Sequence, residues 1–204
     1  MISYFPRLAV AGLTGLVLTA GCAPSVTFNH YTLHSQTIRN VGDLQPKAFS
    51  QSISLGPITL PDIVDRPQLV LRTSEHRVVF TETHRWAGPL KAEITRVLAD
   101  NLVYLLGTRS ISFYPQRGAE RAEVKVSVDV QRFESILGKT ATIDAIWTVQ
   151  WADGMQRTDS THVQEPVVGE NYDALVAAHS RALMVVSQGI ASSIRGGGVA
   201  VPSR

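Results

Sequence analysis

A single cysteine, Cys22, constrains this chain more than any other residue. An apolar stretch over 8–19 precedes it, and Arg7 is the one charged residue before that stretch. The stretch is shorter than the roughly 20 residues that a membrane-spanning helix needs, and it has the length of the apolar region of a secretory signal. One cysteine cannot form an internal disulfide, so the exported fold must be stabilised by packing alone.

The residues up to Cys22 also carry a processing motif. The run LVLTAGC at 16–22 resembles a bacterial lipobox, although Thr19 stands where such motifs usually carry leucine. This resemblance implies cleavage before Cys22, a diacylglyceryl thioether on its sulfur and an acylated amino group. The alternative is an ordinary secretory signal with a chance cysteine. We take 1–21 as a lipoprotein signal peptide and begin the folded protein at Cys22.

Composition limits the partners of the mature chain. Lys and Arg nearly balance Asp and Glu, at 19 against 17 in the full sequence and 18 against 17 without Arg7 of the signal peptide, so no basic field points to nucleic acid. No polybasic patch for anionic lipid is present, and no second apolar segment is long enough to cross a bilayer. The acyl chains on Cys22 must therefore hold the protein to the membrane. Ala23 stands where an aspartate often signals retention in the inner membrane, which favours the periplasmic face of the outer membrane.

Hydrophobic periodicity predicts two amphipathic helices and several strands. The helices cover 87–106 and 172–194, and the strand candidates lie at 28–33, 53–58, 69–72, 77–81, 111–114, 124–131, 140–151 and 157–163. Pro57 and Pro61 cannot donate to a sheet ladder, so the 53–58 strand is expected to run at an edge or to leave the sheet early. We predict an α+β fold, a two-layer sandwich in which two helices pack on one face of a mostly antiparallel or mixed sheet. A single domain spans 22–195, and 196–204 is an expected disordered tail.

Several motifs in order carry a resemblance to a known family. They are SLGPITLP at 54–61, DRPQLVLR at 65–72, RWAGPL at 85–90, LADNL at 98–102, YP at 114–115, RFE at 132–134, Trp147, and the closing helix from Tyr172. Together they resemble the PqiC-type outer-membrane lipoproteins, the auxiliary components of ABC-type and MCE-protein transport systems. The resemblance covers about 31–194.

The family resemblance implies a function and partners. It implies a lipid-anchored accessory subunit that docks an MCE-domain transport protein at the outer membrane, for intermembrane lipid transport and membrane integrity. It also implies that such a lipoprotein can act as a ring-like homo-oligomer. Two alternatives remain open, a lipid-binding periplasmic carrier and an envelope hydrolase.

Candidate residues for a partner interface cluster in the proline-containing signature. Prolines stiffen a segment, so it loses little entropy on binding, although they can equally turn a corner at a sheet edge. Arg and Trp are enriched at interface hot spots, but the indole of Trp86 can instead anchor the first helix to the sheet. The candidates are Pro57, Pro61, Asp65, Arg66, Arg85 and Trp86.

The candidate catalytic residues in the sequence are better explained by other roles. The acidic pair Asp62 and Asp65 has Arg66 beside it and prolines around it, which is typical of a turn. His30 and His34 have no acidic ligand at a recognised metal spacing. We expect no enzyme activity, metal or cofactor, apart from the covalent lipid on Cys22. The hydrolase alternative would place its chemistry on Asp62, Asp65 or His84.

Overall fold

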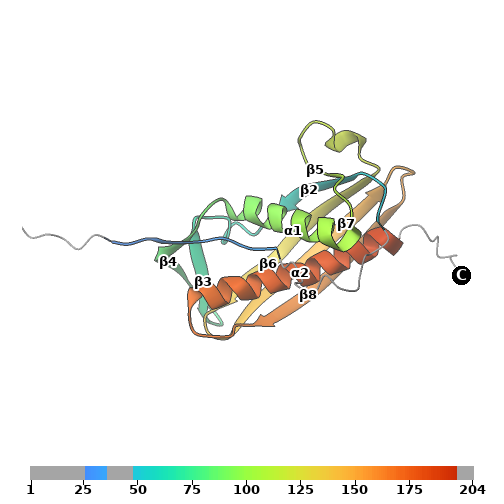
Figure 1. Cartoon of the computed structure of the whole chain (residues 1–204). Helices are drawn as coiled ribbons and strands as arrows, with labels where there is room; N and C mark the ends of the chain where they lie inside the picture. The colour runs from blue at the N-terminus through green and yellow to red at the C-terminus, as the bar shows by residue number, and fades with distance from the viewer. Residues whose placement is uncertain (1–25, 36–47, 197–204) are drawn as a thin grey trace, which may run out of the picture.

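The computed structural model describes residues 26–35 and 48–196. The expected signal peptide, Cys22 and 197–204 lie outside the described residues, as does 36–47 within the polar region that precedes the second strand. Figure 1 shows an elongated body in which two helices lie across strands.

The larger of two sheets has five strands in the order β5-β2-β6-β7-β8. Strand β2 pairs in parallel with β5 and β6, whereas β6, β7 and β8 form an antiparallel meander. The predicted α+β class with a mixed sheet is therefore confirmed. The strands are β2 (Ile53–Thr59), β5 (Ile111–Phe113), β6 (Val124–Ile136), β7 (Thr140–Trp151) and β8 (Gln156–Pro166).

Tight turns join the strands of this meander. Gly154 adopts a left-handed conformation with φ of 88°, and the Asp153 carboxylate accepts a hydrogen bond of 2.9 Å from the backbone N–H of Met155. Only glycine takes such a φ without strain, so the Asp153-Gly154 pair reverses the chain as the sequence predicts.

Both helices pack on the same face of the five-stranded sheet (Figure 1). They are α1 (Leu90–Leu106) and α2 (Tyr172–Gly196). Gly107, at φ of 64°, ends α1, and the Asn171 side chain caps α2 by accepting a hydrogen bond from the N–H of Ala174. Helix α1 begins three residues later than predicted, because the N–H of Ala87 is still bonded to the carbonyl of Tyr31.

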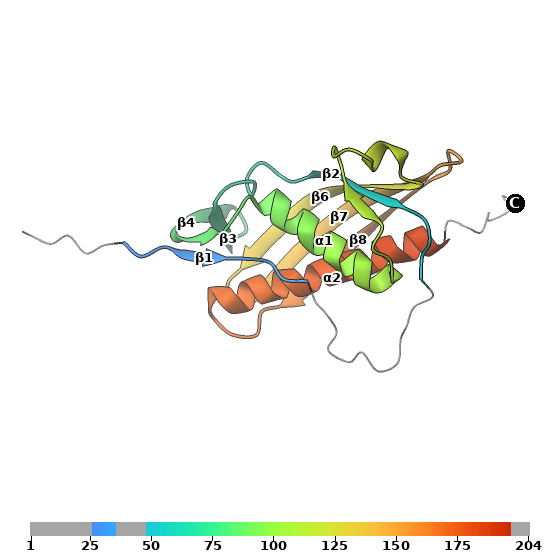
Figure 2. The same ribbon diagram turned by 45° about the horizontal axis from the view of Figure 1, so that its top comes forward.

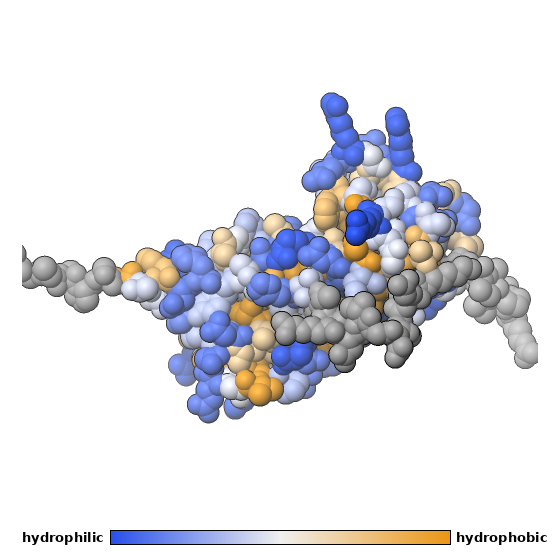
Figure 3. Space-filling model, viewed as in Figure 1, coloured by the Kyte–Doolittle hydropathy of each residue, from blue (hydrophilic) through white to orange (hydrophobic). Residues whose placement is uncertain are grey.

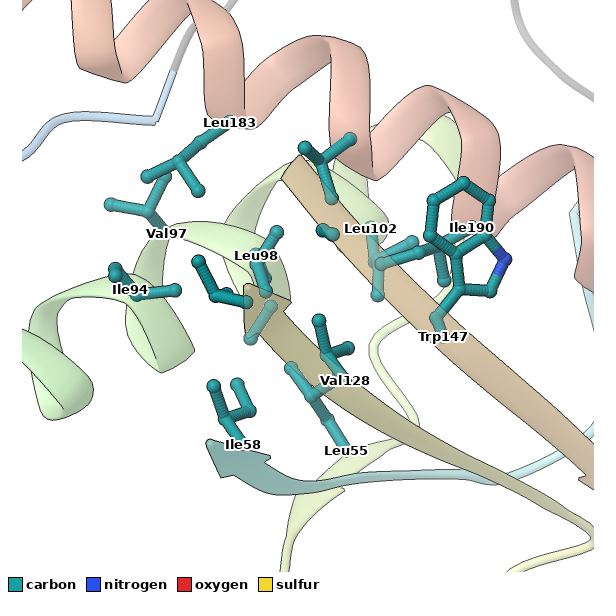
Figure 4. Close-up of a cluster of buried hydrophobic side chains, with 14 of the residues drawn as sticks. Leu55, Ile58, Ile94, Val97, Leu98, Leu102, Val128, Trp147, Leu183 and Ile190 are labelled. Atoms are coloured by element: carbon teal, nitrogen blue, oxygen red, sulfur yellow. The ribbon is translucent and has the colours of Figure 1, made fainter. Parts of the chain in front are cut away.

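The layer between helices and sheet is the core. Figure 4 shows side chains from both helices meeting those of β2, β6 and β7, with Trp147 below α2. Trp147 and Trp151 are buried on the helix-facing side of β7, as their alternation predicts. Each buried Leu or Ile contributes roughly 1.5–3 kcal/mol, so this layer can stabilise a fold without disulfides.

Helix α2 corrects one sequence expectation, that no second segment is long enough to cross a bilayer. With 25 residues and a mean hydropathy of 1.2 in its most apolar window, α2 is the one such helix among the described residues. However, 67% of that window is buried inside the protein. The apolar side chains of α2 cover the sheet, so this is the signature of a core helix.

A second sheet, not anticipated from the sequence, has three strands in the order β1-β4-β3. Its members are β1 (Asn29–Tyr31), β3 (Gln68–Ser74) and β4 (Arg77–Trp86). Strands β3 and β4 form the predicted hairpin, and β1 pairs in parallel with the end of β4. An ion pair between Arg72 of β3 and Glu134 of β6 links this small sheet to the larger one.

The first alternative for the proline-containing strand, a position at the edge of the sheet, is wrong for its first half. Residues 53–55 of β2 lie between β5 and β6. Strand β5 pairs only with these three residues, so Pro57 lies beyond them, and the register with β6 shifts between Leu55 and Ile58. Pro57 has no backbone N–H to donate to a neighbouring strand, and this is tolerated because strand β5 ends before it.

Candidate interaction surface

The loop between β2 and β3 carries three of the candidate interface residues. The carbonyl of Pro61 accepts hydrogen bonds from the N–H groups of Val64 and Asp65, at 3.0 and 3.3 Å. This turn buries Val64 and leaves Ile63 44% exposed. The Asp65 carboxylate lies 3.4 Å from the ammonium group of Lys91 in α1, a partly exposed ion pair of little energetic weight.

Arg66 lies over an aromatic ring. Its guanidinium carbon is 4.0 Å from the ring centroid of Phe80, within the range of a cation–π contact. The Nε atom of Arg66 is buried and has no hydrogen-bond partner. The ring of Phe80 is nevertheless 46% exposed, so the pair presents an apolar surface and a cation together.

Arg85 and Trp86 are adjacent in β4 but point in opposite directions. The Arg85 guanidinium carbon lies 4.4 Å from the ring centroid of Phe28, which is 45% exposed. Trp86 is only 5% exposed and meets Phe133 edge to face, with ring centroids 6.1 Å apart. The structure thus gives Trp86 the anchoring role that the sequence offered as an alternative.

The structure brings most of the six candidate residues together at one end of the small sheet. Asp65, Arg66 and Trp86 line one hollow of about 330 Å³ beside the start of α1. Pro61 lines a neighbouring groove of about 500 Å³ between the two sheets, next to Arg72 and Glu134. Pro57 is separate, because it lies on β2 beyond the end of β5.

The neighbourhood of Pro57 contains a second exposed feature. A Cβ on Gly56, which has φ of 113°, would lie 3.3 Å from the Cβ of Tyr114, and the N–H of Tyr114 bonds to the carbonyl of Leu55. The Tyr114 side chain is 55% exposed. A groove of about 540 Å³, lined mostly by apolar surface, lies nearby between α1 and Phe113.

The residues that a hydrolase would use have separate partners. Nδ1 of His84 and the hydroxyl of Tyr31 are 2.7 Å apart, and the imidazole stacks on Tyr172 at 3.7 Å. Asp65 is paired with Lys91 instead. Burial raises the pKa of Tyr172 and is the largest cause of the raised pKa of Tyr31. Among the described residues, no three or more His, Asp or Glu side chains are placed to hold a metal ion.

Sequence reasoning missed the aromatic halves of the two arginine contacts. Phe28 lies in the segment before β1, far from the proline-rich signature in the sequence, and Phe80 lies in β4, eight residues after the 65–72 motif. The role of Phe28 depends on the pairing of β1 with β4, which no local motif encodes. Around Phe80 the residues Val78, Val79 and Phe80 form an apolar run without alternation, so the local pattern does not identify the exposed face.

Comparison with known proteins identifies relatives of the whole folded body. The family model described as "ABC-type transport auxiliary lipoprotein component" matches residues 31–191. A crystal structure described as an uncharacterized protein is 19% identical, with a TM-score of 0.68, over 82% of this chain and 99% of that one. A crystal structure of a protein from Xanthomonas campestris is 17% identical, with a TM-score of 0.66, over 81% of this chain and 94% of that one. No curated protein matches. At these identities the two structures share the fold.

Proposed function

Because the chain belongs to the family of ABC-type transport auxiliary lipoprotein components, we propose that it is a lipid-anchored accessory subunit of an MCE/ABC-type envelope transport system. In this role it docks the periplasmic transport component at the outer membrane, through acyl chains on Cys22. The transported class would be phospholipid or another hydrophobic molecule that moves between the two membranes.

The observation that carries this proposal is that the chain enters the folded body at one of its two ends. Figure 2 shows strand β1 of the small sheet at one end of the body, the turn between β7 and β8 at the other, and the segment after β5 between them. Cys22 is only four residues before Val26, the first described residue, which leaves a reach of about 13 Å when fully extended. An anchor at one end leaves the segment after β5 and the far end available to a partner in the periplasm.

We place the partner contact around Pro57 and Tyr114. Tyr114 is a large exposed aromatic side chain, a residue type enriched at interface hot spots. Pro57 beside it has a fixed φ, so this part of the surface loses little entropy when it is bound. The apolar groove between α1 and Phe113 extends the same surface.

Two features favour a dock over the other candidate functions. The side chains between helices and sheet form an apolar cluster, with a second, smaller cluster at the start of α2, whereas a carrier needs an open cavity there for an acyl chain. His30, His34 and Asp173 line one hollow of about 320 Å³, but the Ser180 hydroxyl in it donates to the carbonyl of Val176 and accepts from the N–H of His34. In this hollow the serine is therefore not paired with a base, as a hydrolase would require. Both features support an accessory subunit that acts by binding.

A site-specific crosslink tests the docking proposal. A photoreactive phenylalanine analogue replaces Tyr114 in the full chain, and the same analogue at exposed Gln150 on β7 is the matched control. We expect the Tyr114 position to crosslink an MCE-domain or ABC-transport component in intact cells, identified by mass spectrometry. Equal crosslinking from both positions, or no transport component at Tyr114, would contradict the assignment.

A further inference from the structure

The small sheet carries an exposed aromatic side chain, Phe80. Strand pairing sets Phe80 opposite Val70 and Arg85 opposite Gln68, with a register shift between the two pairs. Leu69 is buried in the core, whereas Val70 lines the groove between the two sheets, so Phe80 lies beside this groove. Phe80 is 46% exposed, and Arg85 is partly exposed.

Two arginine–phenylalanine pairs lie in or beside the small sheet, Arg85 with Phe28 and Arg66 with Phe80. The Nε of Arg85 donates to the carbonyl of Glu82 at 3.1 Å, but neither guanidinium forms an ion pair with a carboxylate within 26–35 and 48–196. Each pair therefore combines an exposed ring with a cation whose charge no carboxylate there neutralises. Ile63 adds a third exposed apolar side chain beside them, at the groove that Val70 and Val78 line. We call Phe28, Ile63, Arg66, Phe80 and Arg85 the outward patch.

The outward patch lies at the end of the molecule where the chain enters. Val26, 64% exposed, lies two residues before Phe28, and Cys22 lies four residues before Val26. Figure 3 shows apolar side chains at the end from which the N-terminal segment leaves. At roughly 3.3 Å per residue, six residues separate Phe28 from Cys22 by at most about 20 Å. An acyl anchor would hold this patch within reach of a bilayer surface.

The chemistry of the patch fits the surface of a phospholipid bilayer. Aromatic and aliphatic side chains enter the boundary between headgroups and acyl chains, to a depth of roughly 5–10 Å. Guanidinium groups donate paired hydrogen bonds to phosphate oxygens in a geometry that a phosphate accepts well. A soluble protein partner could use the rings, but the short tether makes the bilayer the first surface that they meet.

We propose that the outward patch contacts the lipid headgroup layer, with Phe28, Phe80 and Ile63 at the apolar boundary and Arg66 and Arg85 on phosphates. This contact rests on the proposed acylation of Cys22, and it goes further by fixing the orientation of the body. The lipid alone would leave the domain free to rotate on its tether. With the patch bound, the end that carries the turn between β7 and β8 is held towards the periplasm.

Depth-dependent fluorescence quenching tests the contact on the acylated full-length protein. Phe28→Trp and Phe80→Trp each introduce an indole that keeps a ring for the neighbouring arginine. Met155→Trp, at a 42% exposed position in the turn between β7 and β8, is the matched control at the other end, and the native tryptophans are all buried, so the unsubstituted protein supplies the background. Each protein is reconstituted into vesicles of phosphatidylethanolamine and phosphatidylglycerol, with or without lipids brominated near the headgroup. Only the fraction that floats with the vesicles is measured.

We expect Phe28→Trp and Phe80→Trp to lose most of their emission in brominated vesicles, and Met155→Trp to lose none. Replacing both Arg66 and Arg85 with Gln should reduce the quenching, whereas Arg121→Gln, near the turn between β7 and β8, should leave it unchanged. Floating protein whose Phe28→Trp and Phe80→Trp variants are quenched no more than Met155→Trp would overturn the contact and leave the anchor standing. Protein that does not float would overturn both the contact and the anchor.

Discussion

Gly189 of α2 lies directly against the indole ring of Trp147 in β7. A Cβ built on Gly189 would be 2.7 Å from Cη2 and 2.9 Å from Cζ2 of that ring, closer than real Cβ contacts come. The glycine in the middle of this long helix is therefore a packing requirement, because it lets the helix approach the largest side chain of the sheet. Neither of these atoms is at the flexible end of a side chain that could move aside.

We predict that Gly189→Ala destabilises the protein even though alanine is the better helix former. The gain in helix propensity is about 1 kcal/mol, whereas overpacking a core typically costs about 1–3 kcal/mol. We expect a net loss of up to about 2 kcal/mol in the free energy of unfolding, measured by urea denaturation. Ser192→Ala, at an exposed position of the same helix, is the control and should be neutral or slightly stabilising. A stabilised Gly189→Ala protein would show that the indole can shift.

The same tryptophan starts a chain of hydrogen bonds to the surface. The indole Nε1 donates to the hydroxyl of Ser193 at 3.0 Å, and that hydroxyl donates to the Asp159 carboxylate at 2.6 Å. These bonds and the Arg157 guanidinium hold the pKa of Asp159 below its usual value, with the Ser193 bond as the largest cause.

Ser193→Ala should leave the buried indole N–H without a partner. We expect a loss of about 1–3 kcal/mol in unfolding free energy, the range for an unsatisfied buried donor. The pKa of Asp159 should rise at the same time, which an NMR titration of its carboxyl carbon can measure. Ser192→Ala is again the control. An unchanged stability together with an unchanged Asp159 titration would mean that this chain of bonds does not form in solution.

His179 of α2 makes stability depend on pH. It is fully buried, stacks on Phe133 at 4.0 Å, and its Nε2 lies 2.8 Å from the hydroxyl of Ser135. Burial lowers the pKa of His179 from 6.5 to about 3. The unfolded chain therefore binds a proton near pH 6.5, but the folded protein does not until about pH 3. Stability is full above pH 6.5 and falls as the pH decreases towards 3.

Between these two pKa values, the free energy of unfolding should fall by about 1.4 kcal/mol for each unit by which the pH decreases, the value for one bound proton. Urea unfolding at a series of pH values measures it. Above about pH 5 unperturbed carboxyl groups are largely ionised, so they contribute little to the dependence of the unfolding free energy on pH. His179→Gln should therefore reduce that dependence above about pH 5. His76→Gln, at an exposed position, should keep the slope of the original protein. A slope that persists in His179→Gln would assign the effect to other groups.

The sequence predicted the fold well where signals were local. The alternation in 140–151 matches β7, and the stripe of Leu and Ile residues up to Leu106 predicts α1, because burial on one face imposes a period. The turn at Asp153-Gly154 follows from the left-handed conformation that glycine allows. The second sheet could not be predicted in this way, because β1 pairs with a strand more than 50 residues away.

The candidate site was predicted only in part, for the same reason. The sequence identified Arg66 and Arg85, but the rings that they cover come from strand pairing. It also treated Pro57 and Trp86 as parts of one surface, whereas tertiary packing buries the indole and places the proline beside Tyr114. The expected homo-oligomer stays a prediction, which sedimentation of the acylated protein in detergent can check.

Cys22→Ser removes the proposed attachment point of the lipid without touching the described fold. Cys22 lies outside the described residues, and the core needs no disulfide, so we expect a folded protein with unchanged unfolding free energy. The substituted chain should appear in the soluble periplasmic fraction, because two or more acyl chains are what hold such a protein firmly to a membrane. It should incorporate no radiolabelled palmitate, because the attachment point is gone. Envelope function should fall, since a dock must be fixed to the membrane that it serves.

The conservative control is Thr19→Leu, which restores the usual lipobox residue and should leave labelling and location intact. Retention of Cys22→Ser in the outer-membrane fraction with full function would show that the lipid is not the anchor.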